Sequence, residues 1–220
     1  KQSLRHDPSR IYLTGHSMGG HGTWHLGVTY PDCFAAIGPS AGWLSRSSYG
    51  GPRCDREDDS PMGLLLARCR KAQDTVALSA NLKQQGVYIL HGGGDDNVPA
   101  QEARTMAEVL QGFHHDWTYH EEPNMGHWWG NAYDDGGTAC VDWPLMFDWF
   151  ARHALAPSST VREVEFVTAN PGVSSRCHWL TIEGQIRHLN LSKAHVQLWP
   201  NKRLFKGTTE NVAVLRLDVS

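Results

Sequence analysis

The sequence lacks long apolar runs, a strong net charge and paired cysteine motifs. No apolar run approaches the about 18 residues that a membrane-spanning helix needs. A formal charge of -3 over 220 residues provides no general attraction to nucleic acid or to anionic lipid. The 22 glycines and 11 prolines are too few for a low-complexity chain, in which the two together exceed roughly 25%. We therefore expect a folded chain that can bury a core and that has no nucleic-acid or membrane partner.

The five cysteines include no CxxC pair, which disfavours a zinc ribbon or a thioredoxin-like site. Five is an odd number, so at least one thiol stays outside any intramolecular disulfide. Cys54 and Cys69 are close enough in sequence to form a bridge, but buried or free thiols explain them equally well. The histidines near His114 and His120 lack the spacing typical of metal ligands. We expect neither a metal nor a cofactor, and the cellular compartment is left open.

Short apolar segments alternate with helical patterns over the first two thirds of the chain. Strands are predicted at residues 11–14, 35–37, 87–90 and 116–121, and helices at 18–30, 61–72, 75–85, 100–112 and 143–155. Gly86 is interpreted as the glycine that ends the helix before it. This alternation is typical of an α/β fold with a mostly parallel sheet between layers of helices.

A small polar linker at residues 156–159 precedes a change of pattern. The following segments alternate apolar and polar residues and show no helical period, and turn-forming residues such as Asn170-Pro171-Gly172 separate them. We predict two units, an α/β domain at residues 1–156 and a small antiparallel β module at residues 157–220. Because the module has so few residues, we expect its stability to depend on contacts with the first domain.

The stretch Gly15-His16-Ser17-Met18-Gly19 matches the pattern GxSxG and lies between a predicted strand and a predicted helix. In such a nucleophile elbow, the serine occupies a sharp turn that glycines allow the backbone to make. The start of the helix places the Met18 N–H beside any oxyanion that forms when the serine attacks. The context predicts Ser17 as a nucleophile and Met18 as an oxyanion-hole donor.

A serine hydroxyl needs a base to take its proton, and the base needs an orienting carboxylate. Asp95 follows the third predicted strand and His127 follows the fourth. The order Ser17, Asp95, His127 is the one that α/β-hydrolases use. Asp96 is a competitor for the carboxylate role. Asp95 is favoured because it, and not Asp96, occupies the aspartate position of an HGxxDxxVP pattern at residues 91–99.

Three segments carry a family resemblance: residues 15–24, the HGxxDxxVP pattern at residues 91–99, and Gly126-His127-Trp128-Trp129. The chain resembles an α/β-hydrolase of the prolyl oligopeptidase-like group, which overlaps with feruloyl-esterase-like and polyhydroxybutyrate-depolymerase-like esterases. The resemblance implies a serine hydrolase that forms an acyl-enzyme on Ser17, with His127 as general acid and base and Asp95 as its orienting group. It favours a peptidase and leaves a carboxylic ester hydrolase as the alternative.

The same resemblance implies that the four predicted strands are the C-terminal half of the hydrolase sheet. The family's second oxyanion donor comes from a loop that would precede Lys1. We therefore expect the first predicted strand to have an unpaired edge, and we expect activity to belong to a longer chain.

Tryptophans are candidates for substrate contacts. Trp43 follows the second predicted strand, and Trp128 and Trp129 directly follow His127, so the three could line an acyl or aromatic pocket, with core packing as the alternative. Trp24 is expected in the core. If the chain were instead a binding protein on a hydrolase fold without the chemistry, Trp179 and Trp199 could form an aromatic platform for a carbohydrate or a protein.

Overall fold

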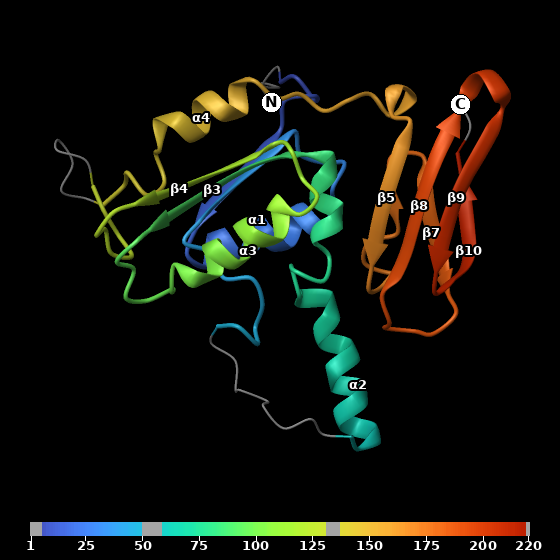
Figure 1. Cartoon of the computed structure of the whole chain (residues 1–220), viewed down its shortest axis with the longest axis horizontal. Helices are drawn as coiled ribbons and strands as arrows, with labels where there is room; N and C mark the ends of the chain where they lie inside the picture. Colours follow the sequence, from blue (N-terminus) through green and yellow to red (C-terminus); the bar gives the residue numbers. More distant parts are fainter. Residues whose placement is uncertain (1–5, 50–58, 131–136, 219–220) are drawn as a thin grey trace, which may run out of the picture.

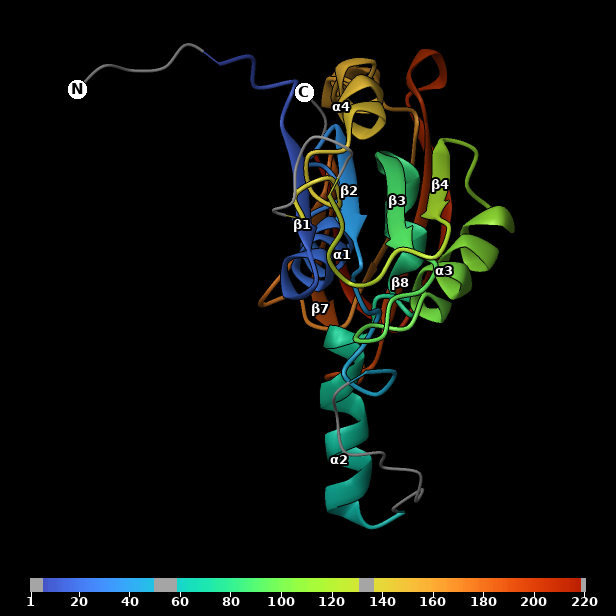
Figure 2. The ribbon, with the colours of Figure 1, turned by 90° about the vertical axis from the view of Figure 1, so that its left-hand side faces the viewer.

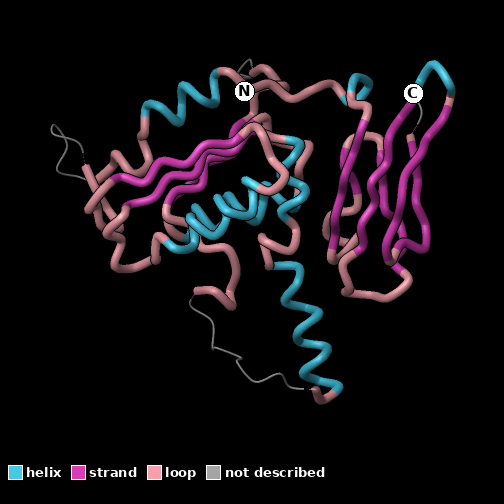
Figure 3. Tube along the Cα trace, viewed as in Figure 1, coloured by secondary structure: helices cyan, strands magenta, loops and turns pink. Residues whose placement is uncertain are grey.

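The computed structural model describes residues 6–49, 59–130 and 137–218. An α/β unit carries most of the helices, and a unit made of β-strands follows it in the chain (Figure 1). Figure 3 shows the strands collected in these two groups. No described helix is both long enough and apolar enough to cross a membrane.

The first unit is built on a parallel sheet in the order β1-β2-β3-β4. Its strands are β1 (Tyr12–His16), β2 (Ala36–Ser40), β3 (Gly86–Gly92) and β4 (Trp117–Glu122). Every residue of the two central strands is buried, whereas the residues of β1 and β4 are half-buried. The predicted fold class, a half-sheet of an α/β-hydrolase with β1 at one edge, is confirmed.

Helices cover both faces of this sheet because the central strands are apolar on both sides. Helices α1 (Met18–Thr29) and α3 (Gln101–Gln111) lie on one face and α4 (Pro144–Ala151) lies on the other (Figure 1). Along β3, Val87 and Ile89 pack toward α1 and α3, while Tyr88 and Leu90 pack toward α4. The alternation of side chains along one strand thus builds two separate cores.

Helix α2 (Pro61–Arg70) projects away from the sheet in two views (Figures 1 and 2). The Ser60 hydroxyl caps its first turn by accepting a hydrogen bond from Gly63 N at 3.1 Å, and proline occupies the first helical position. None of its residues is buried. A short 3₁₀ turn, η1 (Lys71–Gln73), continues it.

The helix predicted at residues 75–85 is wrong in type and length. The structure has a turn followed by a 3₁₀ helix, η2 (Ser79–Gln84). Gly86 does not end a helix but opens β3. A Cβ atom at Gly86 would lie 2.6 Å from the His153 ring, so a larger residue there would require that ring to move.

The β module is two antiparallel sheets of three strands each. One contains β5 (Glu163–Thr168), β8 (Ser192–Trp199) and β9 (Leu204–Glu210), and the other contains β6 (Arg176–Cys177), β7 (Leu180–Gln185) and β10 (Val212–Leu217). Short 3₁₀ turns, η3 (Ser158–Thr160) and η4 (Pro200–Lys202), precede β5 and β9. Buried side chains from both sheets, including Phe166 and Ile182, form a third core.

Buried polar contacts join the module to the α/β unit. The fully buried Asn81 amide donates to Val28 O at 2.7 Å and to Val167 O at 2.8 Å, and its oxygen accepts from Val167 N at 2.8 Å. The Ser174 hydroxyl donates to Thr29 O, at the end of α1. The module lies beyond the amino-terminal ends of β3 and β4, whose carboxyl ends point away from it (Figure 1).

Candidate active site

Ser17 stands at the sharp turn between β1 and α1. Its backbone has φ 57° and ψ -116°, a conformation that costs an L-residue about 1–3 kcal/mol and persists only where packing enforces it. Two hydrogen bonds hold the turn: Ser17 N donates to Ser40 O at 2.9 Å, and His21 N donates to Ser17 O at 2.9 Å. The turn therefore has the form that the GxSxG pattern predicts.

The turn depends on two glycines, Gly15 and Gly20. Gly15 belongs to the GxSxG motif, whereas Gly20 lies just after it. A Cβ at Gly15 would lie 2.5 Å from Gly19 O, and a Cβ at Gly20 would lie 2.2 Å from Ser40 O. At Gly19 itself, a Cβ would meet no described atom within 4 Å. The close approach of the backbone thus requires Gly15 and Gly20, whereas Gly19, the last glycine of the motif, has open space around it.

Asp95 and His127 form a buried hydrogen-bonded pair. His127 Nδ1 lies 2.8 Å from Asp95 Oδ2, and the two side chains are 7% and 0% exposed. The other Asp95 oxygen accepts hydrogen bonds from Asn97 N and Val98 N, both at 2.9 Å. Asp96 is exposed. The carboxylate beside His127 therefore belongs to Asp95.

The sheet brings these two residues together because β3 and β4 are neighbours. Their following loops are joined by backbone hydrogen bonds, from Gly93 N to Glu122 O at 2.9 Å and from Gly94 N to Met125 O at 2.8 Å. His91, at the end of β3, is completely buried, and its Nε2 lies 3.0 Å from Val98 O and 3.3 Å from Asp95 Oδ2. Burial lowers the pKa of His91, so this ring is neutral and donates to Val98 O.

His16 connects the elbow to His127, a contact that the sequence interpretation missed. Its ring centroid lies 4.8 Å from that of His127 and 4.2 Å from that of Trp128. Its Nδ1 lies 3.0 Å from Ser40 Oγ, and that hydroxyl donates to Cys140 O at 2.6 Å. Burial, and then the proximity of His127, lower the pKa of His16 to about 4. The position of His16 directly before Ser17 was the available signal.

Ser17 directly follows His16 in the chain. Within the described residues, the Ser17 hydroxyl makes no side-chain hydrogen bond. Catalytic hydrogen bonds often tighten only when substrate is bound.

The three predicted substrate tryptophans lie in different surroundings. Trp43 stacks on His21 with centroids 4.8 Å apart and contacts Tyr49 at 4.8 Å. Trp128 is 61% exposed above His16, whereas Trp129 is only 5% exposed. Trp129 packs in the core between the sheet and α4, which fits the core-packing alternative and not a pocket wall. Trp24 is buried in the core, as expected.

A cavity of about 450 Å³ opens beside the start of α1. It is lined by Met18, His21, His25, Trp43, Arg46, Tyr49 and Gln73. Because Met18 follows Ser17, the cavity borders the elbow. Trp43 is the one predicted substrate tryptophan that lines it.

The histidines near His114 and His120 and the cysteines were the other candidate site residues, and their side chains make ordinary structural contacts. His114 Nε2 donates to Gln85 O at 3.1 Å, and His120 pairs with Glu122 at 2.7 Å. No group of three or more metal-ligating side chains occurs in residues 6–49, 59–130 and 137–218. Cys33, Cys69, Cys140 and Cys177 are free thiols. A bridge from Cys54 to Cys69 was one of two possibilities in the sequence, and Cys54 lies outside the described residues.

Residues 1–128 match the family described as "Putative esterase". The chain belongs to this esterase family. An "Uncharacterized secreted protein" of Arthroderma benhamiae is 30% identical over 148 residues, which are 67% of this chain and 15% of that protein. A protein of Salmonella typhimurium described as "Putative carboxymethylenebutenolidase" is 27% identical over 150 residues, 67% of this chain and 48% of its own. The chain thus spans half or less of the length of these relatives.

Solved structures with the same fold include an acylaminoacyl peptidase in complex with a chloromethyl ketone, with a TM-score of 0.50 and 20% identity. That match covers 67% of this chain and 24% of the peptidase. A Bacteroides ovatus protein described as a "putative dipeptidyl aminopeptidase IV" has a TM-score of 0.51 and 22% identity, over 67% of this chain and 20% of that one. These similarities show that this member of the esterase family has the α/β-hydrolase fold.

Proposed function

We propose that this chain carries the catalytic triad of a serine hydrolase that cleaves carboxylic esters, with Ser17 as nucleophile, His127 as general acid and base, and Asp95 as the orienting carboxylate. The observation that carries the proposal is the buried 2.8 Å hydrogen bond between His127 and Asp95. It lies beside an elbow whose serine has a strained backbone. Ser17, His127 and Asp95 follow three different strands, β1, β4 and β3, of one parallel sheet. The ring of His16, next to Ser17 in the chain, lies 4.8 Å from that of His127, which supports bringing the three together.

The Asp95–His127 bond selects the useful form of the imidazole. Nδ1 donates its proton to Asp95 Oδ2, which leaves Nε2 unprotonated and able to accept the Ser17 proton. The two backbone N–H groups on the other Asp95 oxygen, together with His91 behind the carboxylate, fix the orientation of Asp95. Asp95 would thus stabilise the imidazolium that forms during attack without taking a proton itself.

The chemistry has two steps. Ser17 Oγ attacks the carbonyl carbon while its proton passes to His127 Nε2, and the oxyanion forms next to the Met18 N–H at the start of α1. The C–O bond then breaks, and the alcohol leaves with the proton from His127. A water molecule, activated by His127, hydrolyses the acyl-enzyme in the same way.

Membership of the esterase family supports an ester over an amide as the scissile group. The alternative is a prolyl oligopeptidase-like peptidase, which the HGxxDxxVP pattern at residues 91–99 supports. The cavity at Trp43 is the proposed site for the acyl group, since it borders Met18 and has an aromatic wall of Trp43, His21 and Tyr49. Trp128 would contact the substrate from the His127 side.

The test uses a fluorophosphonate probe, which reacts covalently with activated serines. It is applied to residues 1–220 and to the longest natural chain that contains them. We expect labelling of the longer chain, loss of labelling in Ser17→Ala, and normal labelling in Ser47→Ala, which changes an exposed serine. A longer chain that is folded and unlabelled would support a non-catalytic binding protein instead.

The substrate class is tested separately, with a short-chain chromogenic ester and a chromogenic peptide amide. Faster turnover of the ester, lost in Ser17→Ala, supports the esterase. Turnover of the amide with little turnover of the ester would favour the peptidase.

A further inference from the structure

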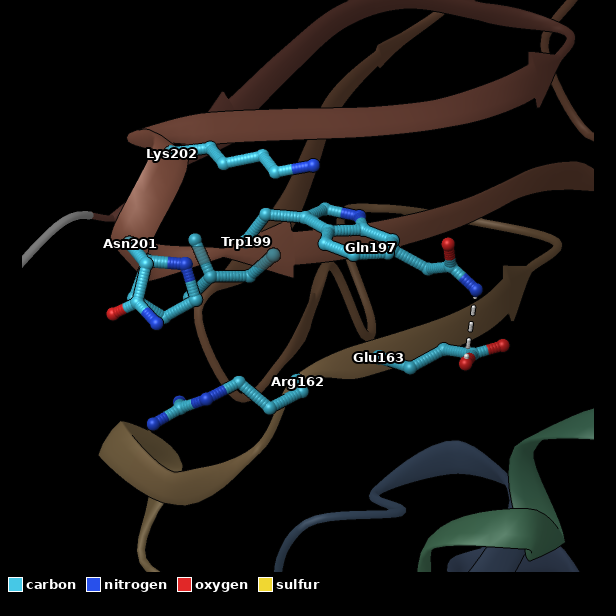
Figure 4. Close-up of a pocket in the computed structure, with 8 residues that line it drawn as sticks. Arg162, Glu163, Gln197, Trp199, Asn201 and Lys202 are labelled. Atoms are coloured by element: carbon cyan, nitrogen blue, oxygen red, sulfur yellow. Dashed lines mark hydrogen bonds between the residues drawn. The ribbon is translucent and has the colours of Figure 1, made fainter.

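The β module has a cavity of its own at the start of the turn between β8 and β9. Its volume is about 530 Å³, within the roughly 300–1,000 Å³ typical of ligand sites. It is lined by Arg162, Glu163, Gln197, Leu198, Trp199, Pro200, Asn201 and Lys202 (Figure 4). None of these residues takes part in the proposed triad or in the cavity at Trp43.

Trp199 provides an open aromatic face in this cavity. Its side chain is 45% exposed, although a large indole gains most from burial. Lys202 Nζ lies 5.2 Å from the ring centroid on one side of the indole, and Arg162 and Glu163 lie on the other side (Figure 4). Trp179 differs, since it is 6% exposed, packs on Phe205 and donates its Nε1–H to Val161 O. Only Trp199 of the two can serve as a platform.

The polar groups around the ring are already fixed in position. Gln197 Nε2 donates to Glu163 Oε2 at 3.2 Å, and His195 Nε2 lies 2.5 Å from Glu163 Oε1. These hydrogen bonds lower the pKa of Glu163, so its carboxylate remains an acceptor. Arg162 Nη1 donates to Ser159 O at 2.6 Å and to Val161 O at 3.4 Å, which leaves the Nε and Nη2 groups of the guanidinium to donate to a ligand. The cavity therefore offers oriented donors and acceptors beside an apolar ring face.

We propose that this cavity binds a saccharide, with a pyranose ring stacked on Trp199 and its hydroxyls hydrogen-bonded by Glu163, Gln197 and Arg162. The C–H groups of a pyranose carry a partial positive charge and are attracted to the negative face of an indole. Its hydroxyls both donate and accept, which matches the mixture of carboxylate, amide and guanidinium groups.

A nucleic-acid strand is the competing ligand, because its bases also stack on tryptophan and its phosphates pair with Arg and Lys. Glu163 stands within the cavity and would repel a phosphate, and the chain as a whole has a net charge of -3. Both observations favour a saccharide.

The module lies at the end of the sheet away from the loops that carry Asp95 and His127 (Figure 1). A ligand at Trp199 would therefore hold the protein on a polymer and would not be the group cleaved at Ser17.

The test measures depletion of the full chain from solution by insoluble cellulose, xylan, chitin and starch, with soluble mannan and pectin in affinity gels. We expect at least one polysaccharide to bind, and we expect Trp199→Ala to weaken that binding at least tenfold. Gln197→Leu, which keeps the size of the side chain and removes its amide, should also weaken it. Val214→Ala changes an exposed side chain on the other sheet of the module and should bind normally.

The melting temperature of each variant is measured alongside, so that loss of binding is separated from loss of fold. Leu145→Ala removes an exposed apolar side chain of α4, outside the module, and should also bind normally. No binding to any of the polysaccharides would overturn the proposal. So would unchanged binding by Trp199→Ala, or binding of a single-stranded oligonucleotide that depends on Trp199.

Discussion

The ring of His16 lies 4.8 Å from the ring of His127, centroid to centroid, and tilts 48° from it. One of these histidines precedes Ser17 in the chain and the other pairs with Asp95. The end of β1 and the loop after β4 are therefore in contact through the imidazole rings of His16 and His127. The pKa of His16 is lowered to about 4, because the ring is largely withdrawn from water and because His127 is close.

We expect the protein to lose stability as the pH falls from about 6.5 toward 4. The folded state holds His16 with a pKa near 4, below the usual 6.5, so the unfolded chain binds a proton more strongly in this window. The full contribution is present above about pH 6.5 and is lost on acidification. Burial also lowers the pKa of His25, His91, His114 and His178, which act in the same direction.

Urea denaturation at several pH values measures this effect. His16→Phe keeps an aromatic ring against His127 and Trp128 but cannot titrate, so its stability should vary less between pH 7 and pH 5 than that of the wild type. His115→Phe, at an exposed position, should keep the wild-type slope. An unchanged slope in His16→Phe would contradict the assignment.

On the chromogenic ester used to test the proposed function, we expect Asp95→Asn to lower kcat by about three to four orders of magnitude. The amide can donate to His127 and would hold the imidazole in the wrong tautomer. Asp96→Asn changes an exposed neighbour and should leave kcat within about twofold. Similar losses in both variants would argue against the orienting role of Asp95.

We expect Gly20→Ala to destabilise the fold, because its Cβ would lie 2.2 Å from Ser40 O, a backbone atom that cannot easily move. Overpacking of this kind costs about 1–3 kcal/mol. Gly22→Ala is the matched control, since its Cβ would meet no described atom within 4 Å. It should stabilise α1 by about 0.5–1 kcal/mol. Equal stability of the two variants would contradict the close packing of the elbow.

We expect Asn81→Ala to cost at least about 3 kcal/mol of unfolding free energy. It leaves the buried backbone groups of Val28 and Val167 without partners, and each such group costs about 1–3 kcal/mol. Lys83→Ala removes an ion pair with Glu165 that joins the same two units but is partly exposed, and it should cost under about 1 kcal/mol. Chemical denaturation of both variants gives the comparison.

Local patterns allowed most of the α/β unit to be predicted. The four strands are short apolar segments followed by turns, and Ser17, Asp95 and His127 follow three of them, in the order that α/β-hydrolases use. The parallel pairing of β3 with β4 places the loops that follow these two strands side by side. The contact between Asp95 and His127 follows from this topology.

The features that were missed depend on tertiary contacts. Strand β9 has one half-buried residue, Phe205, and is otherwise exposed, so it has no apolar alternation to detect. Residues 75–85 look helical, but Asp74 Oδ1 accepts from Ala77 N and Asn81 is bonded across to β5, which favours a turn and a 3₁₀ helix. Trp129 sits next to exposed Trp128 in the chain, and only the position of α4 makes one of them core.

Helix α1 has Ser17 at its first turn, and its last residue, Thr29, accepts a hydrogen bond from Ser174 of the β module. Asp32, three residues further, accepts from His178 N at 2.8 Å. A helix of 12 residues is a rod about 18 Å long, so its two ends move together. Cutting the chain after residue 156 would remove these contacts from the far end of the helix. The β module therefore helps to fix the position of Ser17, although it lies far from that residue in the sequence.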